Sequence, residues 1–342
     1  MIKHIHTDTT SVNFLKLEER IFEVNDSSLC KVEEFKDLLL QLSKQKSSTL
    51  IMATGGSKVV AYYLQLVLER IGLTGNICEV IEPRDYFYKP NKEMFSNLVV
   101  VSTSGNTNGV QDALINFSGQ KYLICEQAID KDCFVVSWAN ELYEKEKSFI
   151  SLASSLCPIT LLLDGVEALN LPYSHSIQDI NYKIKKLLEC SSKKIDSLSF
   201  DFCQTQLFHI LSGYDTKVSS SALESNLVEA GIGIPIIHDK GSFCHGRSNL
   251  LFQNPESVVF YLEHQRKELD DMLLYYIDKE YANVSVFDTE EIHDSIYWKE
   301  YYLLLQMYFL SKKIANDKNM ELTQPEYNPR LVKNFYEFKG VM

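Results

Sequence analysis

The 342-residue chain has little of what marks several common protein classes. Its 14 glycines and 8 prolines are too few for a fibrous or low-complexity chain. Its longest apolar runs, such as Leu303–Leu305 and Met307–Leu310, are far shorter than the ~18 residues of a membrane span. Lys and Arg number 34 against 46 Asp and Glu, which gives a net charge of −12. Because an acidic surface repels phosphate backbones and anionic lipid, we expect neither nucleic acid nor membrane as a partner.

The eight cysteines form no CxxC pair, which argues against a zinc ribbon or a dithiol site. No His, Cys, Asp or Glu cluster has the spacing of metal ligands, so the sequence implies no metal and no organic cofactor. Several cysteines, such as Cys125, lie in apolar runs, where a free thiol packs as a small hydrophobic group. Met1–His4 leads directly into polar Thr7–Thr10, unlike a secretory signal. We therefore expect a reduced, cytoplasmic protein.

Short apolar runs alternate with amphipathic helical patterns along the whole chain, as in α/β proteins with parallel sheets. The helical patterns include residues 11–24, 31–45, 148–163, 264–278 and 296–315, whereas residues 82–93 are expected to form a polar loop. The strands are predicted at 49–52, 77–81, 98–101, 121–125 and 134–137, and again at 208–212, 232–237, 257–262 and 284–287.

The order of these elements predicts two tandem three-layer α/β/α domains with parallel sheets. Their similar length and order indicate duplication of one domain. The expected divisions are an N-terminal helical extension (1–30), a first domain (31–173), a linker helix (174–195), a second domain (196–316) and a C-terminal tail over the active site (317–342).

The strongest chemical signal is Ser102-Thr103-Ser104-Gly105-Asn106-Thr107, between a buried strand and a helix. Backbone N–H groups at a helix N-terminus favour an anion, hydroxyls add donors, and Gly105 permits close backbone approach. A second turn, Gly55-Gly56-Ser57, follows the strand at 49–52. The alternative is that these residues only cap helices. Two such turns in one sheet favour an anion site, and neither GxxxxGK[ST] nor GxGxxG is present to suggest a nucleotide.

With this loop, the sequence resembles the sugar isomerase (SIS) family over residues of about 30–335. That family shows an S-x-S-G-x-T loop, a preceding glycine-serine turn and often two tandem copies, as in the isomerase half of glucosamine-6-phosphate synthase. The resemblance implies two tandem SIS domains, a sugar-phosphate ligand, and a homodimer with a shared active site. The implied substrate-binding residues are Ser57, Ser102, Thr103, Ser104, Gly105, Thr107 and Ser151.

The resemblance also implies catalytic residues. Glu229 precedes His245 by the spacing of the family's glutamate and histidine, and Lys333 lies in a segment resembling one that carries a sugar-contacting lysine. Where the family has H-G-P, Arg247 follows His245-Gly246, and it suits a substrate with an extra anionic group. Asn226 stands where the synthase has a lysine, so a Schiff base is unavailable there.

These residues fit either of two activities. Glu229 would move a proton between C1 and C2 of a sugar, His245 would open the ring, and Lys333 or Arg247 would stabilise enediolate charge. The same pair would serve an aldose–ketose isomerase or a deglycase acting on an amino-sugar or amine-linked hexose phosphate. The alternative is a non-catalytic sugar-phosphate sensor that regulates a partner protein. Weaker catalytic candidates are Glu224, His238 and Asp239.

Overall fold

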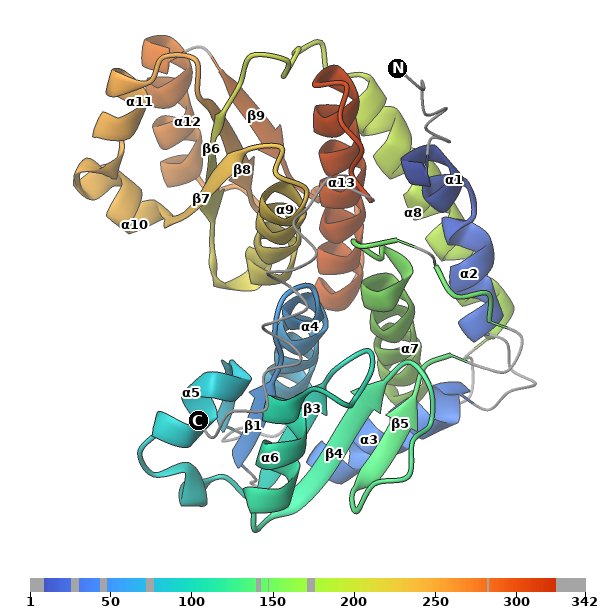
Figure 1. Ribbon diagram of the computed structural model, residues 1–342. Helices are drawn as coiled ribbons and strands as arrows, with labels where there is room; N and C mark the ends of the chain where they lie inside the picture. Colours follow the sequence, from blue (N-terminus) through green and yellow to red (C-terminus); the bar gives the residue numbers. More distant parts are fainter. Residues whose placement is uncertain are drawn as a thin grey trace, which may run out of the picture. The chain divides into compact units, whose positions relative to one another are not determined.

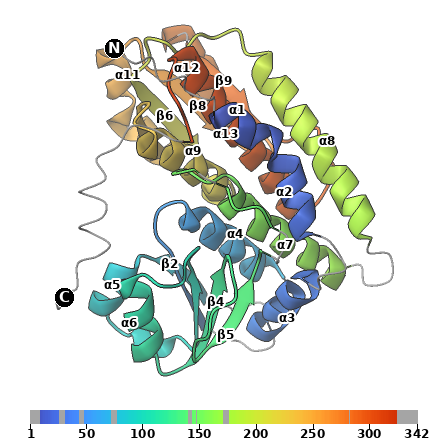
Figure 2. The ribbon, with the colours of Figure 1, turned by 45° about the vertical axis from the view of Figure 1, so that its right-hand side comes forward.

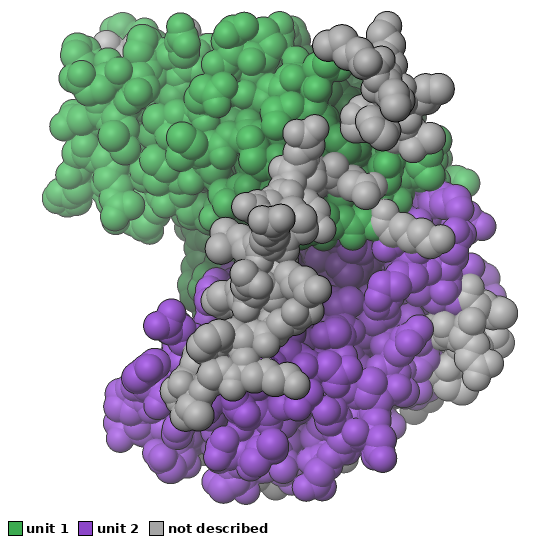
Figure 3. All heavy atoms as spheres, viewed as in Figure 1, with its two compact units in different colours: residues 1–15, 148–150, 183–325 green, residues 16–147, 151–182, 326–342 purple. Residues whose placement is uncertain are grey.

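The computed structural model describes residues 9–25, 31–43, 48–71, 77–139, 143–146, 148–170, 176–281 and 283–323 (Figure 1). They form two compact units (Figure 3). The five-stranded unit, purple in the figure, takes its described residues from within 16–147 and 151–182. The four-stranded unit, green, takes its described residues from within 1–15, 148–150 and 183–325.

The five-stranded unit is a parallel sheet covered on both faces. Its elements are α2 (Leu17–Val24), α3 (Lys31–Ser43), β1 (Ser48–Met52), α4 (Ser57–Arg70), β2 (Ile77–Ile81), α5 (Pro83–Tyr88), the 3₁₀ turn η2 (Lys92–Met94), β3 (Asn97–Val101), α6 (Asn108–Asn116), β4 (Gln120–Cys125), β5 (Phe134–Ser137) and α7 (Ala153–Asn170). The strand order is β2-β1-β3-β4-β5, with every neighbouring pair parallel. The β-branched run of β3 is buried along its whole length, as expected of a strand with both faces covered.

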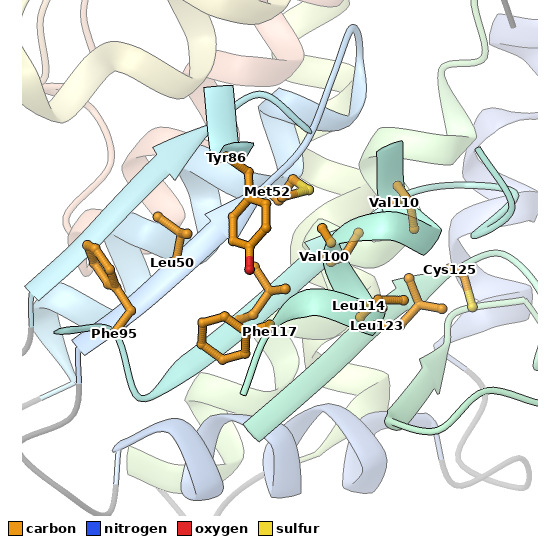
Figure 4. Close-up of a cluster of buried hydrophobic side chains, with 12 residues drawn as sticks. Leu50, Met52, Tyr86, Phe95, Val100, Val110, Leu114, Phe117, Leu123 and Cys125 are labelled. Carbon is orange, nitrogen blue, oxygen red and sulfur yellow. The ribbon is translucent and has the colours of Figure 1, made fainter. Parts of the chain in front are cut away.

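One face of this sheet packs against α5 and α6 (Figures 1 and 4). Leu50, Val100 and Leu123 from three strands meet Tyr86 of α5 and Phe117, which follows α6. The other face is covered by α3, α4 and α7 (Figures 1 and 2). The prediction of a polar loop at 82–93 is wrong, because α5 and η2 form there. Proline begins the helix at its first position, and burial of the Tyr86 ring fixes it to the sheet.

The buried helix α7 carries a carboxyl group in its apolar surroundings. Asp164 has no exposed surface, and burial raises its pKa from 3.8 to about 7. A hydrogen bond from Asn25 opposes this rise. One residue on, Gly165 faces the backbone of α3, since an added Cβ would lie 3.2 Å from Lys36 N. The carboxyl group therefore belongs to a fully buried stretch of α7 that lies in close contact with α3.

The four-stranded unit repeats the same architecture. Its elements are α1 (Thr9–Leu15), most of α8 (Ile177–Asp196), β6 (Leu207–Ser212), the 3₁₀ turn η3 (Tyr214–Thr216), α9 (Lys217–Glu229), β7 (Ile234–Asp239), α10 (Lys240–Ser242), the π-helical turn η4 (Phe243–Arg247), α11 (Asn249–Gln253), β8 (Val258–Leu262), α12 (Glu268–Tyr281), β9 (Val284–Phe287) and α13 (Ile296–Asp317). The parallel strand order is β7-β6-β8-β9. Helices α9 and α13 pack side by side (Figures 1 and 2), and α11 and α12 cover the core around Tyr261.

The predicted pair of parallel α/β sheets is confirmed, but several helix boundaries differ. The pattern at 11–24 is divided at Lys16 into α1 and α2. Helix α7 begins at 153 rather than 148, because the Glu146 carboxylate accepts the Ala153 N–H at 2.9 Å. Helix α12 begins at 268 rather than 264, where Asp270 accepts the N–H of Lys267 at 2.8 Å. Side-chain acceptors, which apolar periodicity does not reveal, fix both starts.

The raised pKa of Asp164 predicts an unusual pH dependence of stability. Between about pH 4 and 7 the folded protein holds a proton on Asp164 that the unfolded chain has released, so stability falls as pH rises across this window. Asp164→Asn should remove this slope. At pH 8 the free energy of unfolding of the variant should exceed that of the wild type by on the order of 4 kcal/mol. This is the energy that corresponds to the difference between the unfolded and folded pKa values of Asp164.

Urea unfolding at pH 4, 6 and 8 measures this effect. Asp112→Asn, at an exposed position on α6, is the matched control and should leave the pH slope unchanged. A slope that is the same in wild type and Asp164→Asn would contradict the assignment.

Candidate functional site

The carboxyl ends of β1 and β3 lie beside each other in the five-stranded unit. The two strands pair in parallel, with Met52 opposite Val100. The chain leaves β1 through residues 53–56 into α4, and leaves β3 through residues 102–107 into α6. Both helix N-termini therefore begin at the same edge of the sheet. Their dipoles and first-turn N–H groups favour an anion there.

A cavity of about 480 Å³ opens at this edge, within the range typical of small-molecule sites. All the predicted hydroxyl residues except Ser151 line it. Pro83, which follows β2, and Asn106 were not predicted to do so. We call this the hydroxyl cavity. Its lining residues are Ala53, Thr54, Ser57, Pro83, Val101, Ser102, Thr103, Ser104, Asn106, Thr107 and Val110.

The hydroxyl groups of the 102–107 loop do not cap its helix. Thr107 is the N-cap residue of α6, yet its side chain accepts no hydrogen bond from that helix. Instead, Ser102 Oγ accepts the Gly105 N–H at 3.2 Å, and Ser104 Oγ accepts the Asn106 N–H at 3.3 Å. Because these oxygens act as acceptors within the loop, their hydroxyl hydrogens can donate to a ligand. The capping alternative therefore does not explain this loop.

Gly105 supports the loop from beneath and is not part of the cavity wall. It has a positive φ of +61°, and an added Cβ would lie 2.6 Å from Ile129 Cδ1 and 3.2 Å from Leu123 Cδ2. Two backbone hydrogen bonds of 3.0 Å join the loop to β4 and its following turn: Ser102 N to Ile124 O, and Glu126 N to Thr103 O. The glycine lets the loop pack on the core while its hydroxyls face outward.

The lining of the hydroxyl cavity carries no charged side chain. The nearest lysine in sequence, Lys58, forms an ion pair with Glu82. An anion in the cavity would thus be held by neutral hydroxyl and N–H donors together with two helix dipoles. Such a site needs no excess of positive charge, which is compatible with an acidic protein.

Ser151 lies outside the hydroxyl cavity wall. Its Oγ donates to Glu146 Oε2 at 3.0 Å, and the same carboxylate accepts from Ala153 N and lies 3.7 Å from Arg20 Nη1. Glu146 and Arg20 were not singled out in the sequence, because no local pattern links residues 126 positions apart. Ser151 helps to order the start of α7, and its role in a sugar pocket stays a prediction.

Glu229 is the last residue of α9 and is half-buried. Burial raises the pKa of its carboxyl group, while the hydroxyl of Ser225 opposes this rise by donating to Oε1 at 2.6 Å. A carboxylate with a raised pKa and a fixed rotamer has the properties of a general base. On the same helix, Asn226 donates to Ser311 Oγ at 3.3 Å, which is a packing role.

His245 and Arg247 are exposed in η4, which follows the carboxyl end of β7. Gly246 between them has a φ of +109°, which turns the chain there. Phe243 anchors the segment by packing on the His238 ring, with centroids 5.3 Å apart. His238 itself is buried and lies 2.9 Å from His209 between their ring nitrogens. The sequence candidate His238 thus belongs to the core, beneath the segment that presents His245.

Within one chain, Glu229 and His245 stand at opposite edges of the four-stranded sheet. Helix α9 runs back to the amino edge, where Glu229 ends it, and β7 then returns to the carboxyl edge before His245. The six residues of β7 span roughly 17–20 Å. One chain therefore does not bring this pair to the same two carbon atoms. Lys333 lies outside the described residues.

The four-stranded unit holds a carboxylate of its own at the N-terminus of α9. Glu300 Oε1 accepts from the backbone N–H of Ser219 at 2.8 Å and from its hydroxyl at 2.9 Å. Glu300 Oε2 lies 3.0 Å from Nε2 of His264, whose pKa is raised by that carboxylate against the effect of burial. His264 follows β8, the counterpart of β3. In the four-stranded unit, the carboxylate of Glu300 therefore occupies the N-terminus of α9, where the helix dipole favours a negative charge.

Among the described residues, no group of three or more His, Cys, Asp and Glu side chains is placed to hold a metal ion. No helix in the described ranges is both long and apolar enough to cross a bilayer.

Solved structures share this fold at low sequence identity. The C-terminal domain of glucosamine-fructose-6-phosphate aminotransferase from Francisella tularensis has a TM-score of 0.69 at 16% identity, covering 95% of this chain and 100% of that domain. A candidate phosphosugar isomerase from Clostridium difficile 630 has a TM-score of 0.69 at 15% identity, with coverages of 96% and 99%.

Glucosamine-6-phosphate deaminase from Thermotoga maritima has a TM-score of 0.65 at 15% identity, covering 93% of this chain and 98% of that one. The chain has the SIS fold. The expectation drawn from the S-x-S-G-x-T loop is therefore confirmed at the level of the fold. No family model matches the sequence, and no curated protein matches it.

Because the 102–107 loop rests on Gly105, Gly105→Ala should both destabilise the protein and weaken anion binding. The positive φ alone costs about 1–2 kcal/mol, and displacement of Ile129 and Leu123 adds to it. Gly231→Ala isolates the φ cost, since Gly231 has a φ of +65° and open space around it. Gly213→Ala, at an extended φ of −100° with no atom within 4 Å, should be nearly neutral.

Thermal unfolding should rank the losses in melting temperature as Gly105→Ala, then Gly231→Ala, then Gly213→Ala. Equal losses for the first two would show that the loop does not depend on close packing beneath Gly105.

Proposed function

We propose that the protein binds a hexose phosphate and is an aldose–ketose isomerase or a deglycase acting on an amino-sugar or amine-linked hexose phosphate. The observation that carries the proposal is the hydroxyl cavity, where two helix N-termini and the 102–107 loop converge. A phosphate dianion offers three oxygens to such donors, and hydrogen bonds to a charged group are stronger than neutral ones. The SIS fold supports the same ligand class by analogy.

In the proposed reaction, Glu229 removes a proton from the carbon next to the sugar carbonyl and returns it to the carbonyl carbon, whose oxygen becomes a hydroxyl group. For a ketosamine phosphate, transfer from C1 to C2 converts the C1–N bond to an imine. Water then adds to C1, and the amine leaves as the aldehyde forms. His245 transfers the proton that opens the ring, and Arg247 or Lys333 stabilises enediolate charge. The raised pKa of Glu229 supports its role as the base.

The proposed reaction requires two copies of the chain. Since Glu229 and His245 of one chain stand at opposite sheet edges, a shared site would take the glutamate from one copy and the histidine from the other. We therefore propose a homodimer. The seven described cysteines are free, which suits a reducing compartment and supports a cytoplasmic location.

The separation of Glu229 from His245 also favours a second candidate function. A chain that keeps the hydroxyl cavity but does not join the catalytic pair would still bind a sugar phosphate. Such a protein would act as a sensor and pass its ligand state to a partner protein.

Removing hydroxyls from the cavity tests the binding part of the proposal. Ser104→Ala and Thr107→Val should each weaken fructose 6-phosphate binding by roughly 10- to 100-fold, because each removes a hydrogen bond to a charged group worth about 1.5–3 kcal/mol. Isothermal titration measures the dissociation constants. Ser118→Ala, exposed on the same unit but outside the cavity, is the control and should bind normally. Unchanged affinity in both cavity variants would contradict the proposal that the phosphate binds in the hydroxyl cavity.

Glu229→Gln tests the catalytic part. It keeps the size of the side chain but removes the base, so turnover of hexose phosphates and ketosamine phosphates should fall by about 10²–10⁴-fold while binding persists. Glu256→Gln, at an exposed position in the same unit, should retain wild-type turnover. If the wild type converts no member of the panel but gains thermal stability from a sugar phosphate, the sensor function replaces the enzyme.

A further inference from the structure

A second cavity, of about 540 Å³, adjoins the hydroxyl cavity in the five-stranded unit. It lies along β2, which is an edge strand of the sheet, and takes its other walls from α4, α5 and the residue after α5. We call it the β2 cavity. Its lining residues are Lys58, Tyr62, Glu79, Val80, Ile81, Glu82, Asp85, Tyr88 and Lys89.

At two places along the chain, consecutive residues line the two cavities. Ser57 lines the hydroxyl cavity and Lys58 the β2 cavity, while Pro83 lines the former and Glu82 the latter. Consecutive Cα atoms are about 3.8 Å apart. The two linings are therefore neighbours, and a ligand that extends from the hydroxyl cavity past Ser57 would reach the β2 cavity at the Lys58–Glu82 ion pair.

Two of the three carboxylates that line the β2 cavity form ion pairs with lysines, and the third does not. Lys58 pairs with Glu82, and Lys89 Nζ lies 2.7 Å from each carboxylate oxygen of Glu79. The exposed carboxylate of Asp85, in the first turn of α5, makes no ion pair or side-chain hydrogen bond with the residues that the structure describes. The cavity lining thus has a net charge of −1, which lies on Asp85.

Two aromatic rings accompany this carboxylate. Tyr62 of α4 and Tyr88 of α5 line the cavity, and Tyr88 is 75% exposed. A ring face attracts an ammonium group, and a carboxylate hydrogen-bonds to it. A carboxylate or a second phosphate would instead meet a negatively charged lining. The composition of the cavity therefore favours a cation at the end of an organic chain.

We propose that the β2 cavity binds an ammonium-bearing substituent of a sugar phosphate whose phosphate lies in the hydroxyl cavity. The inference rests on the proposed function and specifies its substrate class: a hexose phosphate with a cationic amine chain, rather than the bare sugar phosphate. Asp85 is the specificity residue, and Lys58 and Glu82 form the polar boundary between sugar and substituent.

The test uses three probes and the full chain. Fructose 6-phosphate reports on the hydroxyl cavity alone. Fructose 6-phosphate with a 4-aminobutylamino group at C1 carries a terminal ammonium, and its N-acetylated analogue has the same length without that charge. Isothermal titration should show about fivefold tighter binding of the ammonium probe than of its acetylated analogue, a preference that weakens as salt rises.

Asp85→Asn should abolish this preference and leave fructose 6-phosphate binding unchanged. Asp112→Asn, an exposed carboxylate on α6 outside both cavities, should keep the preference. If fructose 6-phosphate binds but the wild type does not distinguish the two amine probes, or Asp85→Asn still does, the β2 assignment is overturned and the proposed function stands. If no probe binds, both are overturned.

Discussion

The site in the five-stranded unit depends on one constraint, which is that the chain must turn from β3 into α6 directly above a packed apolar core. Gly105 meets this constraint because it has no Cβ to displace Ile129 and because it tolerates a positive φ. The loop can then lie flat on the core, joined to β4 and its following turn by two backbone hydrogen bonds. The hydroxyl oxygens of Ser102 and Ser104 accept N–H groups within the loop, and the loop's hydroxyl residues line the hydroxyl cavity. The packing beneath Gly105 thus determines where the hydroxyl groups of the loop lie.

The two units differ in what lies next to the helix N-termini at the carboxyl edge of their sheets. A parallel α/β sheet delivers helix N-termini to its carboxyl edge, and their partial positive charge favours an anion there. In the four-stranded unit, the buried carboxylate of Glu300 takes that position, bonded to Ser219 and His264. In the five-stranded unit, hydroxyls surround a cavity at the corresponding edge. Duplication of one architecture therefore need not give two ligand sites, since one copy has an internal carboxylate at its helix N-terminus.

The sequence allowed prediction of what depends on local pattern. Continuous apolar runs predicted the strands. The S-x-S-G-x-T loop predicted four of the residues that line the hydroxyl cavity, and the preceding glycine-serine turn predicted a fifth, Ser57. Contacts between distant residues were not predictable in this way. Glu146 joins Ser151, Ala153 and Arg20 across more than 120 residues, and this moves the start of α7. Helix α5 was missed because six residues are too few for a periodic signal, although burial of Tyr86 fixes it.

The chain has a net charge of −12, whereas the lining of the hydroxyl cavity carries no charged side chain. This contrast indicates how an anion could bind to an acidic protein. Charges more than about 8 Å from a bound anion are largely screened at physiological salt, so the acidic surface weakens binding less than its total suggests. The lysine nearest in sequence, Lys58, is neutralised by Glu82 and adds little attraction. Affinity for the proposed phosphate would then come from donors within hydrogen-bonding distance, whose number and direction are set by the loop. A ligand recognised in this way is selected by its shape and its hydrogen-bond acceptors rather than by its charge alone.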